Sequence, residues 1–472
     1  MKSPPRFPAV TLPPLASPSR QRWGLASLSL SMLLAALGTS VANVGLPALA
    51  LALHASFQQV QWVTLAYLLT LTALSVSAGR LGDLLGRRTL LLGGIAVFTL
   101  ASALCALAPD LGWLIAGRAL QGLGAASMMA LTLASVGDMT PKNETGRVMG
   151  LLGSLSALGS ALGPSLGGAL ITGFGWPAMF WLTVPLGALA WGLAYRTLPA
   201  NAPRQPLAGQ FDTPGALLLA LALVAYALAT TLGQGRLDGR NLAWLLAALL
   251  STGLFVRQQG RASSPLIRLT LLRDPALRSG LLGSVLVSTV MMATLVVGPF
   301  YLAHGLGLPP LPLGLVVAAG PLVAALTSAP AGRLVDRFGA QRIALLGLAG
   351  LLAGAGGLSL LPLAAGVAAY LAPMVLMTAG YALFQTANNS GVMHGVATAQ
   401  RGVVAGMLNV ARNLGLMSGA SLMGAVFAWG AGASDLTHAP PDALAAGMHA
   451  TFGLAALGLA AMLAIAGRRQ AA

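Results

Sequence analysis

Charged residues are scarce in this sequence. Only 8% of its 472 residues are Asp, Glu, Lys or Arg, and the acidic ones number ten. A soluble protein of this length needs more charge, because its folded surface faces water. The single cysteine, Cys105, excludes a disulfide framework. The composition therefore excludes an ordinary soluble protein.

Catalytic and nucleotide-binding motifs are missing as well. Neither Lys2 nor Lys142 stands in a G-K-[ST] phosphate-binding loop, so an ATP-driven pump is excluded. The sequence has no H-E-x-x-H, paired-Cys or G-x-S-x-G motif, so we expect no metal or other cofactor. An enzyme is disfavoured, because the apolar segments contain no pair of acid and base residues.

Long apolar runs fill most of the chain. Hydrophobic residues make up 56% of the sequence, and the mean hydropathy is +0.81. Runs near the length of about 20 residues that crosses a bilayer recur from Trp23 onward. We therefore predict an all-α polytopic membrane protein with fourteen transmembrane helices. The predicted spans are Leu25–Leu46, Val60–Ala78, Thr89–Ala108, Leu111–Val136, Val148–Thr172, Ala178–Tyr195, Gly215–Leu232, Leu242–Phe255, Leu281–Leu302, Leu311–Ala331, Ile343–Leu361, Val367–Val392, Val403–Trp429 and Ala446–Ala466.

Basic residues give the chain a net charge of +16, and they gather on one side of the predicted spans. With the N-terminus in the cytoplasm, the opposite loops hold only Arg236 and Arg240, while Arg118 and Arg412 lie within spans. This positive-inside asymmetry predicts cytoplasmic N- and C-termini and anionic membrane lipids as partners, rather than nucleic acid. Residues 1–22 are expected to form a disordered cytoplasmic tail, with a cleavable signal peptide as the less favoured alternative.

A short charged motif occurs twice. "GRLGDLLGRR" from Gly79 and "GRLVDRFGAQR" from Gly332 share the frame G-R-L-x-D-x-x-G, and glycines further along recur at a nearly constant spacing. We interpret this as a duplication in which residues 23–200 and 261–472 form two six-helix bundles of the same orientation. Residues 201–260 then supply a linker and two inserted helices, and a cavity is expected between the bundles.

The two motifs are expected to lie in tight turns between helices. There they would hold the bundles together in one conformation and release them in another, and they also serve as anchors of the membrane topology. The residues assigned to these conformational-switch loops are Gly79, Arg80, Asp83, Gly86, Arg87, Arg88, Gly332, Asp336, Arg337 and Gly339.

The Gly79 motif and three further stretches resemble signatures of the major facilitator superfamily. "GRALQGLGAA" from Gly117 resembles its fourth-helix signature, and "GSALGPSLGG" from Gly159 its fifth-helix exporter signature. "NVGLP" from Asn43 and "QWVTLAYLL" from Gln61 are similar to the first two helices of the fourteen-helix drug:proton antiporter branch. This resemblance covers essentially the whole chain. It implies a multidrug-efflux type of secondary transporter that exports small amphiphiles across a bacterial cytoplasmic (inner) membrane by alternating access.

The fifth predicted span combines a glycine stripe for close helix packing with a proline that bends the helix. The resemblance implies that this helix biases the protein toward export, and plain packing of small residues is the alternative. The residues are Gly159, Gly163, Pro164, Gly167 and Gly168.

Two arginines and several amides lie within the predicted spans. A buried guanidinium is costly, so Arg118 and Arg412 should face a wet cavity or a partner; the resemblance links Arg118 to proton coupling. For the amides, hydrogen bonding between neighbouring helices and contact with substrate both stay open. The cavity residues are expected to be Asn43, Arg118, Gln121, Gln385, Asn388, Asn389 and Arg412, with Met128, Met129 and Tyr301 as apolar lining.

One position departs from the family pattern. Members usually carry an aspartate in the first helix where this chain has Gly38. The sequence predicts no carboxylate and no histidine in the middle of the membrane. We therefore expect neutral or anionic substrates rather than cations. Proton coupling would then use Asp83, Asp138 or Asp212, or water near Arg118. The alternatives are a metabolite or organic-anion exporter without proton coupling, and a receptor-like relative that does not transport.

Overall fold

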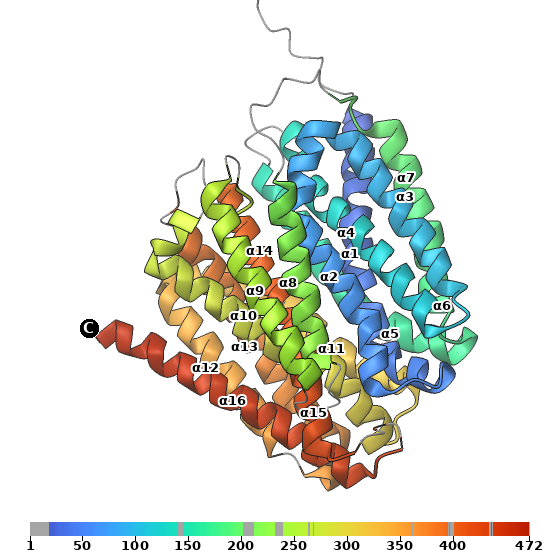
Figure 1. The fold of residues 1–472 in the computed structure, drawn as a ribbon, viewed down its shortest axis with the longest axis vertical. Helices are drawn as coiled ribbons and strands as arrows, with labels where there is room; N and C mark the ends of the chain where they lie inside the picture. The colour runs from blue at the N-terminus through green and yellow to red at the C-terminus, as the bar shows by residue number, and fades with distance from the viewer. Residues whose placement is uncertain are drawn as a thin grey trace, which may run out of the picture.

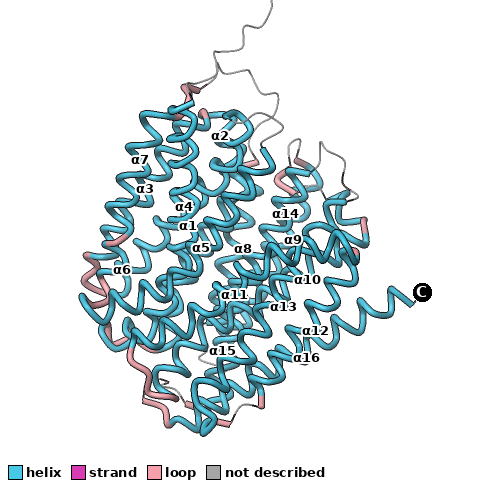
Figure 2. Tube along the Cα trace, turned by 180° about the vertical axis from the view of Figure 1, so that it is seen from behind, coloured by secondary structure: helices cyan, strands magenta, loops and turns pink. Residues whose placement is uncertain are grey.

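The described part of the chain is mostly helical, with short loops between the helices, in its structure, a computed structural model (Figure 2). The described residues are 18–139, 145–201, 212–231, 239–262, 265–267, 269–360, 362–394, 396, 401–433, 436 and 438–471, and they contain no strand. The side chains of Arg80 and Asp83 lie outside this description. Helices suit such apolar segments, because a membrane offers no water to the backbone N–H and C=O groups.

Most of the described chain forms long helices. They are α1 (Pro18–Ala52), α2 (Phe57–Leu85), α3 (Arg87–Ala106), α4 (Leu111–Met139), α5 (Thr145–Phe174), α6 (Ala178–Trp181), α7 (Thr183–Thr197), α8 (Thr213–Thr231), α9 (Gly239–Arg261), α10 (Pro275–Phe300), α11 (Pro310–Phe338), α12 (Ala340–Ser359), α13 (Gly366–His394), α14 (Arg401–Ser418), α15 (Gly424–Ala431) and α16 (Pro441–Ala471). Two π-helical segments, Tyr301–Gly305 (η2) and Gly419–Met423 (η5), extend α10 and join α14 to α15. The described residues also include the short 3₁₀ helices Leu269–Arg273 (η1) and Leu363–Ala365 (η3).

Twelve helical segments of the described residues are long and apolar enough to cross a membrane. The expected count of fourteen is not reached by this measure, because α2 and α5 are not among the twelve. Both are long, with 29 and 30 residues, but each contains side chains outside the description. The span predicted to be the shortest, Leu242–Phe255, lies in α9, which has 23 residues because it continues through polar ends.

The helices pack as two groups, with α8 and α9 beside them (Figure 1). Within the first group α1 packs on α5 and α7, and α4 on α2 and α3; within the second α12 packs on α13 and α16, and α10 on α14. The groups meet where α5 crosses α11, α1 contacts α10 and α2 contacts α14. Helix α8 packs on α9, α2 and η5, so it contacts both groups.

The N-terminal end of α1 is fixed to the first group. Arg20 Nε donates to the carbonyl of Thr197 at 3.2 Å, and Gln21 Nε2 donates to the carbonyl of Met139 at 3.0 Å. Residues 18–22, which were expected to belong to a disordered tail, therefore begin α1. Residues 1–17 of that predicted tail lie outside the described part of the chain.

The glycines of α5 line two different helices. Cβ atoms added at Gly159, Gly163 and Gly167 would collide with α1, and Ser40 Oγ donates across this contact to the Gly159 carbonyl at 3.3 Å. Gly168 faces the second group instead, where an added Cβ would lie 2.5 Å from the Pro310 carbonyl. The stripe thus allows close approach to α1, while Gly168 allows α5 to cross α11.

Aromatic rings close the interface at one end of the molecule, which we call the Phe57 end. Phe57 begins α2 in the first group, and its ring centroid lies 4.5 Å from that of Phe300 and 5.6 Å from that of Phe427 in the second. The same end contains the crossing of Gly168 and Gly314, whose added Cβ atoms would each meet the backbone of the opposite helix. In this conformation the two groups are therefore sealed together at the Phe57 end.

Candidate functional site

Arg118 on α4 is fully buried in the first helix group. Its Nε donates to the Val63 carbonyl of α2 at 2.8 Å, and an Nη donates to Gln121 Oε1 one turn along α4. Its guanidinium also lies over the ring of Tyr67, 4.3 Å from the centroid. The described chain thus surrounds this charge with a carbonyl, an amide and an aromatic face rather than with a carboxylate.

The groups around Arg118 are themselves fixed. Gln121 Nε2 donates to Ser102 Oγ at 2.7 Å, and Tyr67 Oη donates to the Ala35 carbonyl at 2.7 Å. The other Nη of Arg118 has no hydrogen-bond partner among the described residues. A buried guanidinium with a free donor and only neutral neighbours keeps a positive electrostatic potential in its surroundings.

Asn43 on α1 lies beside the same stretch of α2. Its Oδ1 accepts from Thr64 Oγ1 at 2.8 Å, and Thr64 follows Val63 directly, whereas the Asn43 Nδ2 finds no partner in the part of the chain that the structure describes. Asn43, Arg118 and Gln121 are all buried. Asn43 and the Arg118–Gln121 pair thus bind neighbouring residues of α2, and we call the three residues, with Thr64 and Tyr67, the Arg118 cluster.

Gly38, where the resemblance leads us to expect an aspartate, lies against the Tyr67 side of this cluster. A Cβ atom added there would lie 3.2 Å from the Tyr67 hydroxyl and 3.2 Å from the ring of Phe98. These contacts are tight, so a carboxylate at this position requires both rings to move. A side chain at position 38 would therefore start against the rings of Tyr67 and Phe98.

The cavity residues predicted in the second group do not join this cluster. Asn388 Nδ2 donates to the Gly280 carbonyl at 3.0 Å and to Ser284 Oγ at 2.9 Å, which ties α13 to α10. Gln385 is half-buried with an unpartnered Oε1, and Asn389 is exposed. Arg412 is half-buried, and its Nη2 donates to Asn409 Oδ1 at 3.1 Å on the same helix.

Two buried glutamines of α2 were missed by the sequence reasoning. Within the described chain, Gln58 has no hydrogen-bond partner for either amide atom, and Gln61 has none for its Nε2. Gln61 abuts Gly424 in the second group, where an added Cβ would collide with its amide. Gln61 opens the stretch "QWVTLAYLL", so its position in a family motif was the available signal. These amides place unsatisfied hydrogen-bonding groups beside the contact between the two helix groups.

The first charged motif forms a one-residue break between α2 and α3. Gly86 has a φ of 97°, which L side chains rarely adopt. Asn201, which the sequence reasoning also missed, holds this turn: its Oδ1 accepts from the Arg88 N–H at 3.0 Å, and its Nδ2 donates to Thr89 Oγ1 at 2.7 Å. Nothing in the local motif points to Asn201, because it lies far away in the sequence.

The arginines of this motif bind helix carbonyls. Arg88 Nη2 donates to the Tyr195 carbonyl at 2.6 Å, and Arg87 Nη1 donates to the Ala134 carbonyl at 3.3 Å. Cations are favoured at such C-terminal turns by the helix dipole. Gly79 has open space where a side chain would stand, and the side chains predicted at Arg80 and Asp83 lie outside the described residues.

The second charged motif has the same backbone but different surroundings. Gly339 breaks α11 from α12 with a φ of 86°, and neither it nor Gly332 has an atom where a side chain would stand. Asp336 is exposed, and so is Arg337, which lies over the ring of Phe338 at 5.2 Å. Hydrogen bonds thus fix the first motif to its helix group. At the turn of the second motif, no described atom lies near the position of an added Cβ.

Comparison with known proteins identifies the family. The model of the Major Facilitator Superfamily matches residues 28–420. The chain belongs to this superfamily. It is therefore a membrane transporter rather than an enzyme, and its substrates are small molecules. No group of His, Cys, Asp and Glu that could hold a metal ion is present in the described residues.

The relatives of this superfamily member include transporters of different kinds. It is 34% identical to the uncharacterized transporter YebQ of Escherichia coli, covering 86% of this chain and 89% of that protein. It is 31% identical to the drug efflux pump JefA of Mycobacterium tuberculosis (88% and 82% covered) and 29% identical to the riboflavin transporter RibZ of Clostridioides difficile (87% and 89%).

A solved transporter has the same fold. The superfamily member aligns with a bacterial homologue of the human lysosomal transporter Spinster, with a TM-score of 0.68 and 16% identity. The alignment covers 96% of this chain and 98% of that one.

Proposed function

We propose that the protein exports small amphiphilic compounds, of which neutral and anionic ones are preferred, by alternating access. The Arg118 cluster carries this proposal. It holds a buried positive charge, a free guanidinium donor and a free Asn43 donor, with no carboxylate among the described contacts of Arg118. Such a cluster attracts acceptor groups and repels cations.

In this proposal two helix bundles, residues 23–200 and 261–472, rock against each other. Residues 201–260 form the linker and the inserted helices. We include α2 and α5 among fourteen membrane-spanning helices, supported by their length and by their packing on α4 and α1. The Phe57 end would face the outside and is closed here, while the motif turns at Gly86 and Gly339 and both termini would lie in the cytoplasm. The chain would reside in a bacterial cytoplasmic membrane, among anionic lipids.

The direction of transport is supported by the relatives. JefA, at 31% identity, is named a drug efflux pump, and the glycine stripe of α5 that resembles the exporter signature packs on α1. RibZ is named a riboflavin transporter. Its name supports a single metabolite as an alternative substrate for this protein. We propose proton coupling as in the antiporter branch, with protons entering through carboxylates outside the Arg118 cluster.

A second candidate is an organic-anion exporter that does not use protons. The packing of Gly38 favours it, because the glycine supplies no acid where the resemblance leads us to expect one, and a Cβ added there would be tight against Tyr67 and Phe98. Among the carboxylates proposed to replace it, Asp212 is buried and accepts from Gln258 Nε2 and Gln259 Nε2, at 3.0 and 2.6 Å. Asp83 and Asp138 have side chains outside the described part of the chain.

Efflux from proteoliposomes tests both candidates. A cationic, a neutral and an anionic amphiphile of similar size are loaded, and release is followed with and without an imposed proton gradient. We expect the neutral and anionic compounds to leave faster than the cation. Acceleration by the gradient supports the antiporter, and indifference to it supports the uncoupled exporter. Release no faster than from liposomes without protein, or release of the cation alone, contradicts the proposed function.

A further inference from the structure

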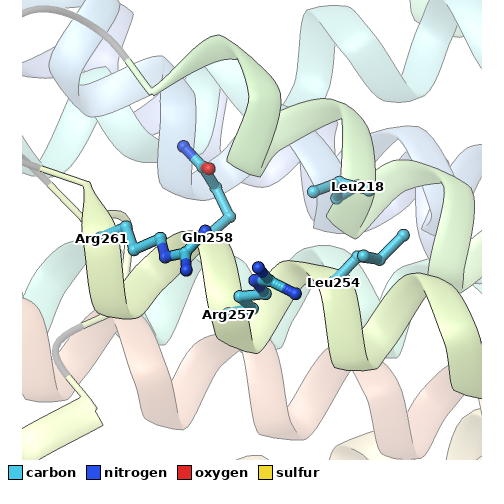
Figure 3. A pocket seen from close by; sticks show the side chains of 5 residues that line it. All are labelled: Leu218, Leu254, Arg257, Gln258 and Arg261. Carbon is cyan, nitrogen blue, oxygen red and sulfur yellow. The ribbon is translucent and has the colours of Figure 1, made fainter.

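A groove of about 220 Å³ lies between α8 and α9, where α8 begins and α9 ends (Figure 3). Polar side chains gather at one end of it and two leucines at the other. Its lining consists of Leu218 from α8 and Leu254, Arg257, Gln258 and Arg261 from α9. The transport cycle proposed above uses none of these residues.

The two arginines of this groove are available to an anion. Arg257 and Arg261 are one helical turn apart on α9, so they lie on the same face, and both are exposed. Neither forms an ion pair within the described residues. The neighbouring carboxylate of Asp212 is buried and accepts from Gln258, Gln259 and the Gly215 N–H, so neutral donors satisfy it.

An apolar path continues from the groove along both helices. Leu221 follows Leu218 on α8 and is 50% exposed, and Leu250 precedes Leu254 on α9 and is 66% exposed. Arg257 is the first charged residue after the apolar run of α9, which places it at the edge of the membrane. The groove thus joins a cationic end at this edge to an aliphatic surface that leads into the membrane.

We propose that this groove binds one anionic phospholipid. The guanidinium groups donate to the phosphate oxygens, and an acyl chain lies along Leu218, Leu254 and their exposed neighbours. Free phosphate has no apolar part to pack against the leucines. A zwitterionic lipid carries an ammonium group that the arginines repel. The phospholipid fills the space between α8 and α9 and so fastens the insert, which in turn holds α14 through the Tyr226 Oη to Ser418 Oγ hydrogen bond of 2.9 Å.

Native mass spectrometry of the full chain in a neutral detergent tests this site. Phosphatidylglycerol and phosphatidylcholine with identical chains are titrated, and the first bound lipid is quantified. We expect phosphatidylglycerol to bind the wild-type protein more tightly. The double variant Arg257→Gln/Arg261→Gln should bind it about 30-fold more weakly, as expected for two arginines at a membrane surface. The matched variant Arg273→Gln/Arg278→Gln, which removes two exposed arginines nearby, should bind like the wild type.

Two further arms use the wild-type protein alone. Millimolar inorganic phosphate should not displace phosphatidylglycerol, and phosphatidylglycerol should raise the melting temperature more than phosphatidylcholine does. The proposal is overturned if the first double variant binds as tightly as the wild type, or if the second loses as much affinity as the first. Displacement by free phosphate, or equal binding of the two lipids to the wild type, also overturns it. These results are independent of transport, so they distinguish a failure of this site from a failure of the proposed function.

Discussion

Replacing Arg118 with glutamine should slow the efflux of anionic amphiphiles by about 30-fold and leave that of cations unchanged or faster. A unit charge about 8 Å from a bound anion, in an effective dielectric of about 20, contributes about 2 kcal/mol, or about 30-fold in affinity. The estimate suits Arg118 because its described contacts are neutral and its side chain is fully buried. Initial efflux rates from proteoliposomes measure the effect for each compound.

Arg412→Gln is the matched control for this variant. Arg412 is the other arginine within a predicted span, but it is bound to Asn409 on its own helix and is not part of the Arg118 cluster. We expect its efflux rates to stay within about threefold of wild type, in line with the typical 0.6 kcal/mol of a polar contact between membrane helices. Arg118→Lys keeps the charge and should recover part of the anion efflux. An unchanged charge preference in a folded Arg118→Gln protein would contradict the role given to Arg118.

Replacing Gly314 with leucine should open the Phe57 end and stop transport. A side chain at Gly314 meets the Pro164 carbonyl and Gly168 of the opposite helix, so α5 and α11 cannot keep their present distance. Overpacking of this kind costs about 1–3 kcal/mol, which shifts the balance between closed and open ends by about 5-fold to 150-fold. A Gln61→Cys probe in a Cys105→Ala background reports the shift, because Gln61 is buried at the sealed contact.

An impermeant maleimide should label the Gln61→Cys probe about 5-fold to 150-fold faster when Gly314→Leu is also present. Gly173→Leu is the matched control, since Gly173 lies on α5 five residues beyond Gly168 and has open space where a side chain would stand. It should label and transport as the probe protein does. If Gly314→Leu transports normally and labels no faster than the control, the crossing of α5 and α11 does not seal this end.

The helical fold followed from the sequence for clear physical reasons, and the family followed from the resemblance of its motifs. Apolar runs of membrane length leave the backbone no other way to satisfy its hydrogen bonds, and the repeated glycine frame reflects backbone geometry. Gly86 and Gly339 indeed hold positive φ angles at equivalent turns. The two π-helical segments were not predicted, because they replace one hydrogen-bonding pattern by another within uninterrupted apolar sequence.

The candidate site was less accessible to sequence reasoning, because its composition depends on which helix faces touch. Arg118 and Gln121 are three residues apart on one helix, so their contact could be expected from helical periodicity. That Gln385 and Asn388 lie apart from them depends on the packing of α13 against α10. The packing of Gly38 against Tyr67 and Phe98 likewise required the positions of three helices.

The most direct test of this account is the affinity of the purified protein for three amphiphiles that share one hydrophobic body. Their head groups are a carboxylate, a primary amide and a primary amine of equal size, and binding is measured by calorimetry in the same detergent. The account predicts that the carboxylate binds at least about tenfold more tightly than the amine, with the amide between them, because the buried charge of Arg118 has only neutral contacts among the described residues. Tightest binding of the amine would contradict it.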